Sequence, residues 1–111
     1  MTNVRHSRFA FFRSPSTPGG SATTIPGSTN LGTFQCGGFS QFVGMFSTVG
    51  SMTLRWQMGV HSGDYQVTSS VVINSGGSIF DQMNYGIYAN FTITAASSQT
   101  PKFLIMGEPL R

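Results

Sequence analysis

The side chains that could carry out chemistry are few in this chain and lie far apart in the sequence. The metal ligands and acid–base groups amount to His6, Cys36, His61, Asp64, Asp81 and Glu108. A zinc site normally takes four such ligands at short, regular spacings. These residues form no such motif, so the sequence predicts no metal site and no cofactor.

The sequence also gives no support for a nucleophilic triad or for the carboxylate pair of a glycoside hydrolase. His61 and Asp64 share one short turn, and no strand-to-helix elbow presents a serine beside them. A carboxylate pair for glycoside hydrolysis would have to come from Asp64, Asp81 and Glu108, whose spacing singles out no two of them. An enzyme is therefore the weakest hypothesis, and we expect neither catalysis nor a small-molecule substrate.

The composition of the chain is poor in charge. Its 111 residues include six Lys and Arg and three Asp and Glu, so 8 % are charged, whereas an ordinary soluble domain is about a quarter charged. Such a surface lacks the charge that keeps small proteins apart in solution. It favours a protein that packs against copies of itself or against other subunits. The net charge of +3 is too small to indicate a nucleic-acid partner.

The apolar runs are short. None is long enough for a transmembrane segment, so we expect no membrane partner. The apolar patch of residues 9–12 ends at Arg13 and is too short for the hydrophobic region of a signal peptide. The chain is therefore expected to be made and used without crossing a membrane. Its one cysteine, Cys36, excludes an intrachain disulfide.

Residues 1–33 differ in character from the rest of the chain. They contain no acid, and residues 14–29 are rich in Ser, Thr, Pro and Gly, a composition that buries too little apolar surface to offset its ordering entropy. The sequence predicts an extended N-terminal arm here, followed by a domain over residues 34–111.

This arm is the first candidate for a functional site. Its phenylalanines could insert into a neighbouring subunit while its arginines pair with carboxylates or carbonyls there. The predicted docking residues are Arg5, Arg8, Phe9, Phe11, Phe12 and Arg13. The competing interpretation, binding to a nucleic-acid backbone with base stacking, has too few arginines.

A period of two in the apolar residues begins after the arm. It is clearest over Met52–Val60, where Met52, Leu54, Trp56, Met58 and Val60 fall on one face. A turn at residues 61–64 joins this strand to one over Tyr65–Ile73, as in an antiparallel hairpin. Further strands are predicted at Phe39–Val49 (with a bulge at Gly44), Ile79–Met83, Tyr85–Ala95 and Lys102–Met106.

The spacing of the turns indicates the fold class. Turn signals recur about every ten residues, which is typical of an all-β protein. We predict an antiparallel β-sandwich or jelly-roll-like barrel of six or seven strands, preceded by the N-terminal arm.

Two aromatic residues need separate interpretation. Trp56 shares its face with Leu54 and Met58, which indicates a core position. Tyr88 shares its face with Asn90 and Thr92, so we expect it to be exposed, as an interface contact or as part of a sugar-binding surface.

Residues 51–111 carry a family resemblance. The strand Thr53-Leu54-Arg55-Trp56-Gln57, the turn Ser62-Gly63-Asp64-Tyr65 and the strand over residues 84–92 resemble those of small β-sandwich structural proteins of tailed bacteriophages. Capsid decoration proteins and head or tail accessory subunits belong to this group. The resemblance rests on short strands, scarce charges and a low-complexity arm, and it carries over no functional residue.

This resemblance implies a non-enzymatic structural subunit of a virus particle, assembled in the host cytoplasm and found in the virion. Its partners would be copies of itself and other structural subunits, contacted through the N-terminal arm. The alternative from another class is a carbohydrate-binding module of a receptor-binding structure, using Tyr88 and neighbouring Asn and Gln side chains.

Overall fold

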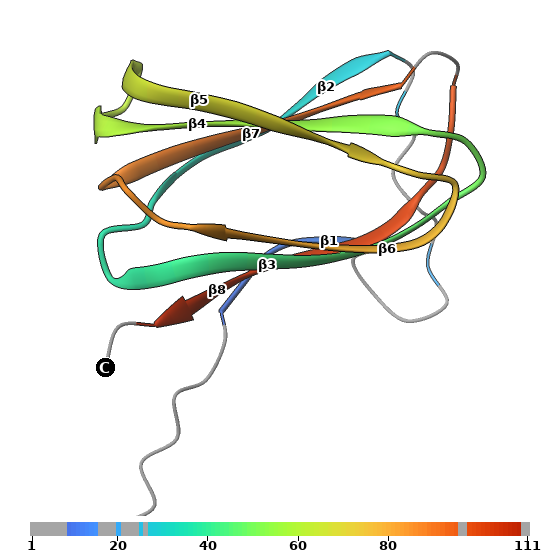
Figure 1. The fold of residues 1–111 in the computed structure, drawn as a ribbon, viewed down its shortest axis with the longest axis horizontal. Helices are drawn as coiled ribbons and strands as arrows, with labels where there is room; N and C mark the ends of the chain where they lie inside the picture. The colour runs from blue at the N-terminus through green and yellow to red at the C-terminus, as the bar shows by residue number, and fades with distance from the viewer. Residues whose placement is uncertain (1–8, 16–19, 21–24, 26, 96–97, 110–111) are drawn as a thin grey trace, which may run out of the picture.

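The chain folds into two antiparallel four-stranded sheets packed face to face, as the computed structural model shows (Figure 1). The structure describes residues 9–15, 20, 25, 27–95 and 98–109. The strands in these ranges are β1 Phe9–Ser14, β2 Ser28–Gln35, β3 Phe39–Thr48, β4 Met52–His61, β5 Asp64–Ile73, β6 Gly76–Met83, β7 Tyr88–Ala95 and β8 Lys102–Pro109. One sheet has the order β1-β8-β3-β6 and the other the order β2-β7-β4-β5.

The predicted β-sandwich is confirmed, but the strand count of six or seven is wrong. The described residues form eight strands, and the two additional ones are β1 and β2. β1 pairs with β8 along the edge of the first sheet, and β2 pairs with β7 along the edge of the second. The boundary expected between residues 33 and 34 therefore falls inside β2. The local composition did not indicate these strands, because they form by pairing with strands more than fifty residues away in the sequence.

The inner faces of the central strands follow the predicted period of two. In β4, Met52, Leu54, Trp56 and Met58 are buried, which confirms the core position of Trp56. Val60 is the exception and is 48 % exposed. The pairing of β4 with β7 ends at Gly59, and the register of β4 with β5 shifts on both sides of Gly59, so the alternation of inward and outward residues need not continue to Val60.

The start of β7 differs from the prediction. The strand begins at Tyr88 rather than Tyr85, and Tyr85 and Ile87 are exposed in the connection from β6. From Ala89 onward the predicted inward residues are buried. An apolar alternation therefore continued into a turn that the pairing with β2 and β4 does not include.

Gly44 is not at a bulge. The pairing of β3 with both β6 and β8 runs through Gly44 without a shift in register. A Cβ atom at Gly44 would lie 2.5 Å from Cε1 of Phe80. The glycine is therefore explained by the neighbouring aromatic ring, which occupies the place of a side chain.

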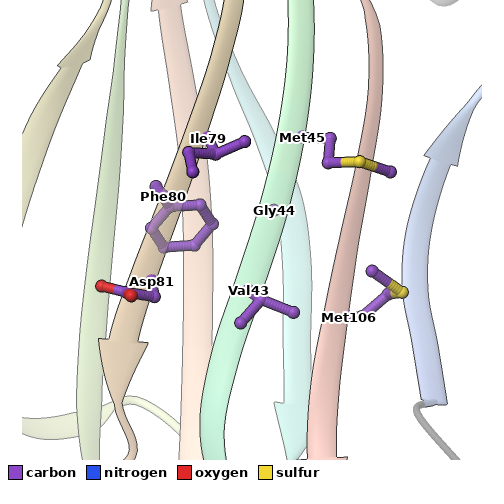
Figure 2. A pocket seen from close by; sticks show the side chains of 7 residues that line it. All are labelled: Val43, Gly44, Met45, Ile79, Phe80, Asp81 and Met106. Atoms are coloured by element: carbon purple, nitrogen blue, oxygen red, sulfur yellow. The ribbon is translucent and has the colours of Figure 1, made fainter.

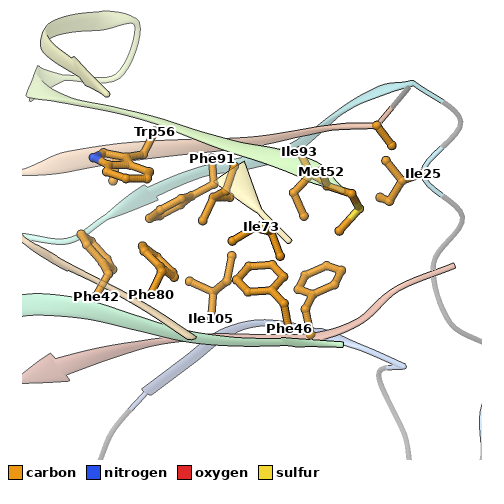
Figure 3. Packing of buried hydrophobic residues seen from close by; sticks show 14 of the residues in the cluster. Ile25, Phe42, Phe46, Met52, Trp56, Ile73, Phe80, Phe91, Ile93 and Ile105 are labelled. Atoms are coloured by element: carbon orange, nitrogen blue, oxygen red, sulfur yellow. The ribbon is translucent and has the colours of Figure 1, made fainter. Parts of the chain in front are cut away.

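The core lies between the two sheets and is largely aromatic (Figure 3). Phe42 of β3 and Phe91 of β7 meet edge to face across the sandwich, with ring centroids 5.2 Å apart. Trp56 of β4 packs on Phe80 of β6, with centroids 5.6 Å apart. These pairs join the two sheets, and such contacts add stability beyond the area that they bury.

Candidate docking surface

Two of the phenylalanines predicted to dock on a neighbour, Phe11 and Phe12, pack against the core of this chain. The Phe11 ring lies 4.6 Å from the ring of Phe34 and 5.6 Å from that of Phe42, measured between centroids. Phe12 lies 4.9 Å from Phe34. The two rings therefore attach β1 to its own sandwich and are not available to insert into another subunit.

The remaining predicted arm residues divide between the described and undescribed parts of the chain. Arg13 is exposed on β1. Arg5 and Arg8 lie outside the described residues, and Phe9 is described only as the first residue of β1. Of the predicted docking residues whose side chains are described, Arg13 alone is exposed.

A different surface has the properties of a docking site: the outer face of the β1-β8-β3-β6 sheet. The register places Met45 between Ile79 of β6 and Leu104 of β8, and places Val43 beside Met106 of β8. We call the apolar face the set of residues Val43, Met45, Ile79, Met83, Leu104 and Met106. Ile79 is 83 %, Met83 61 % and Met45 52 % exposed, so large apolar side chains stand in solvent along two adjacent strands.

The apolar face is grooved between β3 and β6. A hollow of about 450 Å³ lies over Gly44 and is lined by Val43, Met45, Ile79, Phe80, Asp81 and Met106. Figure 2 shows Ile79 and Met45 on adjacent strands above Gly44, with Asp81 and Val43 below. The lining has a single charged group, the carboxylate of Asp81. Such a groove suits apolar side chains rather than a polar ligand.

Charged residues lie around the apolar face, with the basic residues toward one end of the strands and the acidic residues toward the other. The basic half holds Lys102, at the start of β8, and Arg13, which is paired with Leu104. The acidic half holds Glu108, near the end of β8, and Asp81, which is paired with Val43. The two halves of the face therefore carry opposite charge along the strand direction.

One feature of the sequence indicates this face, namely the apolar run in β8. β8 reads Phe103-Leu104-Ile105-Met106 without a polar break, and Phe103 and Ile105 supply its core side. A continuous apolar run is typical of strands that are covered on both faces. In this chain one of those faces is open.

The outer face of the second sheet is polar. Asn90 on β7 lies opposite to the core side of its strand and yet is 7 % exposed. Its Nδ2 donates to Thr33 Oγ1 at 2.9 Å and to Asn30 Oδ1 at 3.1 Å. Tyr88 is half-buried on the same strand. The expectation of an exposed Tyr88 is thus met only in part, since its neighbours cover some of the ring.

Cys36 lies buried at the end of the sandwich where two connections meet. Its Sγ donates to Asn84 Oδ1 and to the Gly86 carbonyl, each at 3.5 Å. Asn84 Nδ2 donates in turn to the carbonyls of Cys36 and Phe39 at 2.7 and 2.9 Å. Burial raises the pKa of the Cys36 thiol, and the Asn84 hydrogen bond acts in the opposite direction with less effect.

Of the residues first considered for chemistry, His6 lies outside the described residues and Cys36 is buried, while His61 and the three acidic residues are divided between the two sheets. His61 and Asp64 are exposed at the turn between β4 and β5, where Gln66 Nε2 donates to Asp64 Oδ1 at 2.7 Å. Asp81 and Glu108 belong to the other sheet. Within the described ranges, no three metal-ligating residues come together, and no helix is long and apolar enough to cross a membrane.

Comparison with known proteins gives information on the fold. No family model matches the chain, and no curated protein matches it. Among solved structures, the one described as the crystal structure of PirA is similar, with a TM-score of 0.52 and 14 % sequence identity. The match covers 78 % of this chain and 89 % of that chain. At this level of identity the similarity supports the β-sandwich fold alone.

Proposed function

We propose that this chain is a non-enzymatic structural subunit of a virus particle, of the capsid decoration or head and tail accessory kind, that acts while docked on neighbouring subunits. The observation that carries the proposal is the apolar face of the β1-β8-β3-β6 sheet. Its exposed Ile79, Met83 and Met45 side chains form a surface that monomeric soluble proteins seldom present. Burying these apolar side chains against protein removes them from water, which is favourable.

The strand order is a second, weaker support. Two four-stranded sheets with the orders β1-β8-β3-β6 and β2-β7-β4-β5 form a jelly roll, an arrangement that viral capsid and lectin domains use. This argument is a fold-level analogy, because one fold serves many functions. The strand order is therefore compatible with a role in a capsid but does not distinguish that role from others.

The mode of docking differs from the one that the sequence suggested. Phe11 and Phe12 pack against the chain's own core, so they are less suited to contact a neighbour than the exposed residues of the apolar face. We propose that the subunit docks through the apolar face.

The proposal is tested by locating the chain in virus particles from its source. Particles purified on a density gradient are expected to contain the chain at a fixed ratio to the major shell protein. Washing at high salt should leave it attached, since apolar contacts are not screened. Finding the chain only in the free protein fraction would refute a structural role in the particle.

A carbohydrate-binding module is the second candidate, and the polar outer face of the β2-β7-β4-β5 sheet favours it. Tyr88 and Gln57 are half-buried there, on adjacent strands, beside the hydrogen-bonded Asn90. A glycan array tests this candidate directly. Binding that a Tyr88→Ala variant loses and a Val72→Ala variant keeps would support it, and no binding at high protein concentration would count against it.

A further inference from the structure

We infer that the apolar face binds the same face of a second copy of this chain, forming a two-fold dimer in which the strands of the two copies run antiparallel across the interface. The inference rests on the proposed function in one respect, namely that the chain works as a subunit. It goes further by naming the occupant of the face and its orientation.

The apolar face is best buried against another apolar protein surface. β8 places Leu104 and Met106 on its outer side with the same regularity as Phe103 and Ile105 on its inner side. β3 does the same with Val43 and Met45. Strands that are apolar on both sides are typical of sheets that are covered on both faces, and here the other sheet of the sandwich covers the inner face alone. A second copy supplies the missing layer with an equally apolar surface.

Charge complementarity favours a second copy over another cover. Lys102 and Arg13 lie in the basic half of the face, and Asp81 and Glu108 lie in the acidic half. A two-fold axis that lies in the interface, parallel to the two sheets and at right angles to the strands, places the basic half of each copy over the acidic half of the other. Lys102 then faces Glu108 of the second copy, and the pair occurs twice. Opposed charges of this kind fix the orientation of an interface more than they add affinity.

The size of the face is sufficient for a specific dimer. Its central strands, β3 and β8, have ten and eight residues, and a four-stranded sheet of that length measures roughly 26 by 19 Å in plan. The relief of its side chains raises the accessible area above that plan area of about 500 Å². A standard specific interface buries about 800 Å² on each partner. The face is of the right order, and a two-fold contact is the commonest arrangement in homo-oligomers.

The first experiment measures the mass of the full chain by sedimentation equilibrium over a range of concentrations. The unmodified chain is expected to be a dimer at micromolar concentration. Ile79→Glu is expected to raise the dissociation constant at least tenfold, because it places a charge among the apolar side chains of the interface. Ile79 is 83 % exposed on an edge strand, so the substitution leaves the fold intact. Val72→Glu is the matched control, since Val72 is 59 % exposed on β5, the edge strand of the other sheet.

The second experiment tests the orientation. Lys102→Glu should weaken the dimer because it places two carboxylates opposite each other. The exchange of both charges, Lys102→Glu with Glu108→Lys, should restore the dimer toward the affinity of the unmodified chain. Thermal melts of each variant confirm that the sandwich is folded. A dimer indifferent to Lys102→Glu, or one that the exchange does not restore, would overturn the antiparallel arrangement.

The outcomes separate this inference from the proposed function. A chain that stays monomeric at all concentrations yet is present in particles would refute the second copy as occupant, and another subunit would then cover the face. A dimer that Ile79→Glu breaks, in a chain absent from particles, would support the inference and refute the virion role. Equal weakening by Ile79→Glu and Val72→Glu would refute the apolar face as the interface.

Discussion

The phenol oxygen of Tyr65 lies 3.0 Å from Oγ1 of Thr33, although the two residues belong to opposite edge strands of the same sheet. β7 and β4 lie between them, and in a flat sheet the axes of β2 and β5 would be about 14 Å apart. The contact therefore indicates that the β2-β7-β4-β5 sheet is bent or twisted rather than flat. Shifts of register in the β4–β5 pairing, next to Gly59, are consistent with such a bend.

The hydrogen bonds beneath this contact are predicted to matter more than the contact itself. Asn90 is buried, and Asn90→Ala would leave Asn30 and Thr33 without their amide partner. We expect a loss of about 1–3 kcal/mol in the free energy of unfolding, against less than about 1 kcal/mol for Tyr65→Phe. Urea denaturation measures both values. The ranking would be contradicted if Tyr65→Phe cost as much as Asn90→Ala.

Gly44→Ala should destabilise the sandwich through a single methyl group. The added Cβ would meet the Phe80 ring at 2.5 Å, and that ring also packs on Trp56, with centroids 5.6 Å apart. Overpacking of this kind costs about 1–3 kcal/mol. Gly77→Ala on the adjacent strand is the control, because nothing lies within 4 Å of the added Cβ there. Thermal melts of equal midpoint for the two variants would disprove the explanation of Gly44 as a space-making glycine.

The Cys36 thiol is predicted to be inert in the folded protein. Burial raises its pKa, so at pH 8 its thiolate fraction is smaller than that of a free thiol, and access is blocked as well. A disulfide reagent at pH 8 should react slowly with the native chain and rapidly with one equivalent after denaturation. Rapid reaction of the native chain would show that Cys36 is accessible.

The same raised pKa predicts a loss of stability in alkali. The unfolded thiol ionises at a lower pH than the folded one, so the contribution of Cys36 is present below its ordinary pKa. It is lost as the pH rises through the raised value. A Cys36→Ser variant should lack this part of the alkaline decline, which denaturation curves between pH 7 and 10 would detect.

Truncation should distinguish residues 1–8 from residues 9–33. Removing residues 1–8 leaves every described strand in place, so the cooperative melt should persist. Removing residues 1–33 deletes β1 and most of β2, and with them the Phe11 and Phe12 contacts. We expect no cooperative transition for the longer deletion. A native-like melt after removal of residues 1–33 would show that β1 and β2 are dispensable.

The periodicity of the sequence was sufficient to predict several strands and their inner faces. Met52, Leu54, Trp56 and Met58 were assigned to the core from their spacing alone, and all four are buried. This worked because β4 is a central strand with one covered face, so burial follows the pleat. The prediction was wrong at Tyr85 and Val60, where apolar alternation continues beyond the pairing of the strands.

The sequence by itself determined that the chain is an all-β sandwich with few charges, because alternation and turn residues act over a few neighbouring positions. Only the tertiary structure showed that Phe11 and Phe12 belong to the core, since they pack with Phe34, which is distant along the chain. Only the tertiary structure assembled the apolar face, because Ile79, Met45 and Leu104 become neighbours through the pairing of β6, β3 and β8. Pairing between strands distant in sequence leaves no local signature, so the candidate docking surface was decided by the fold.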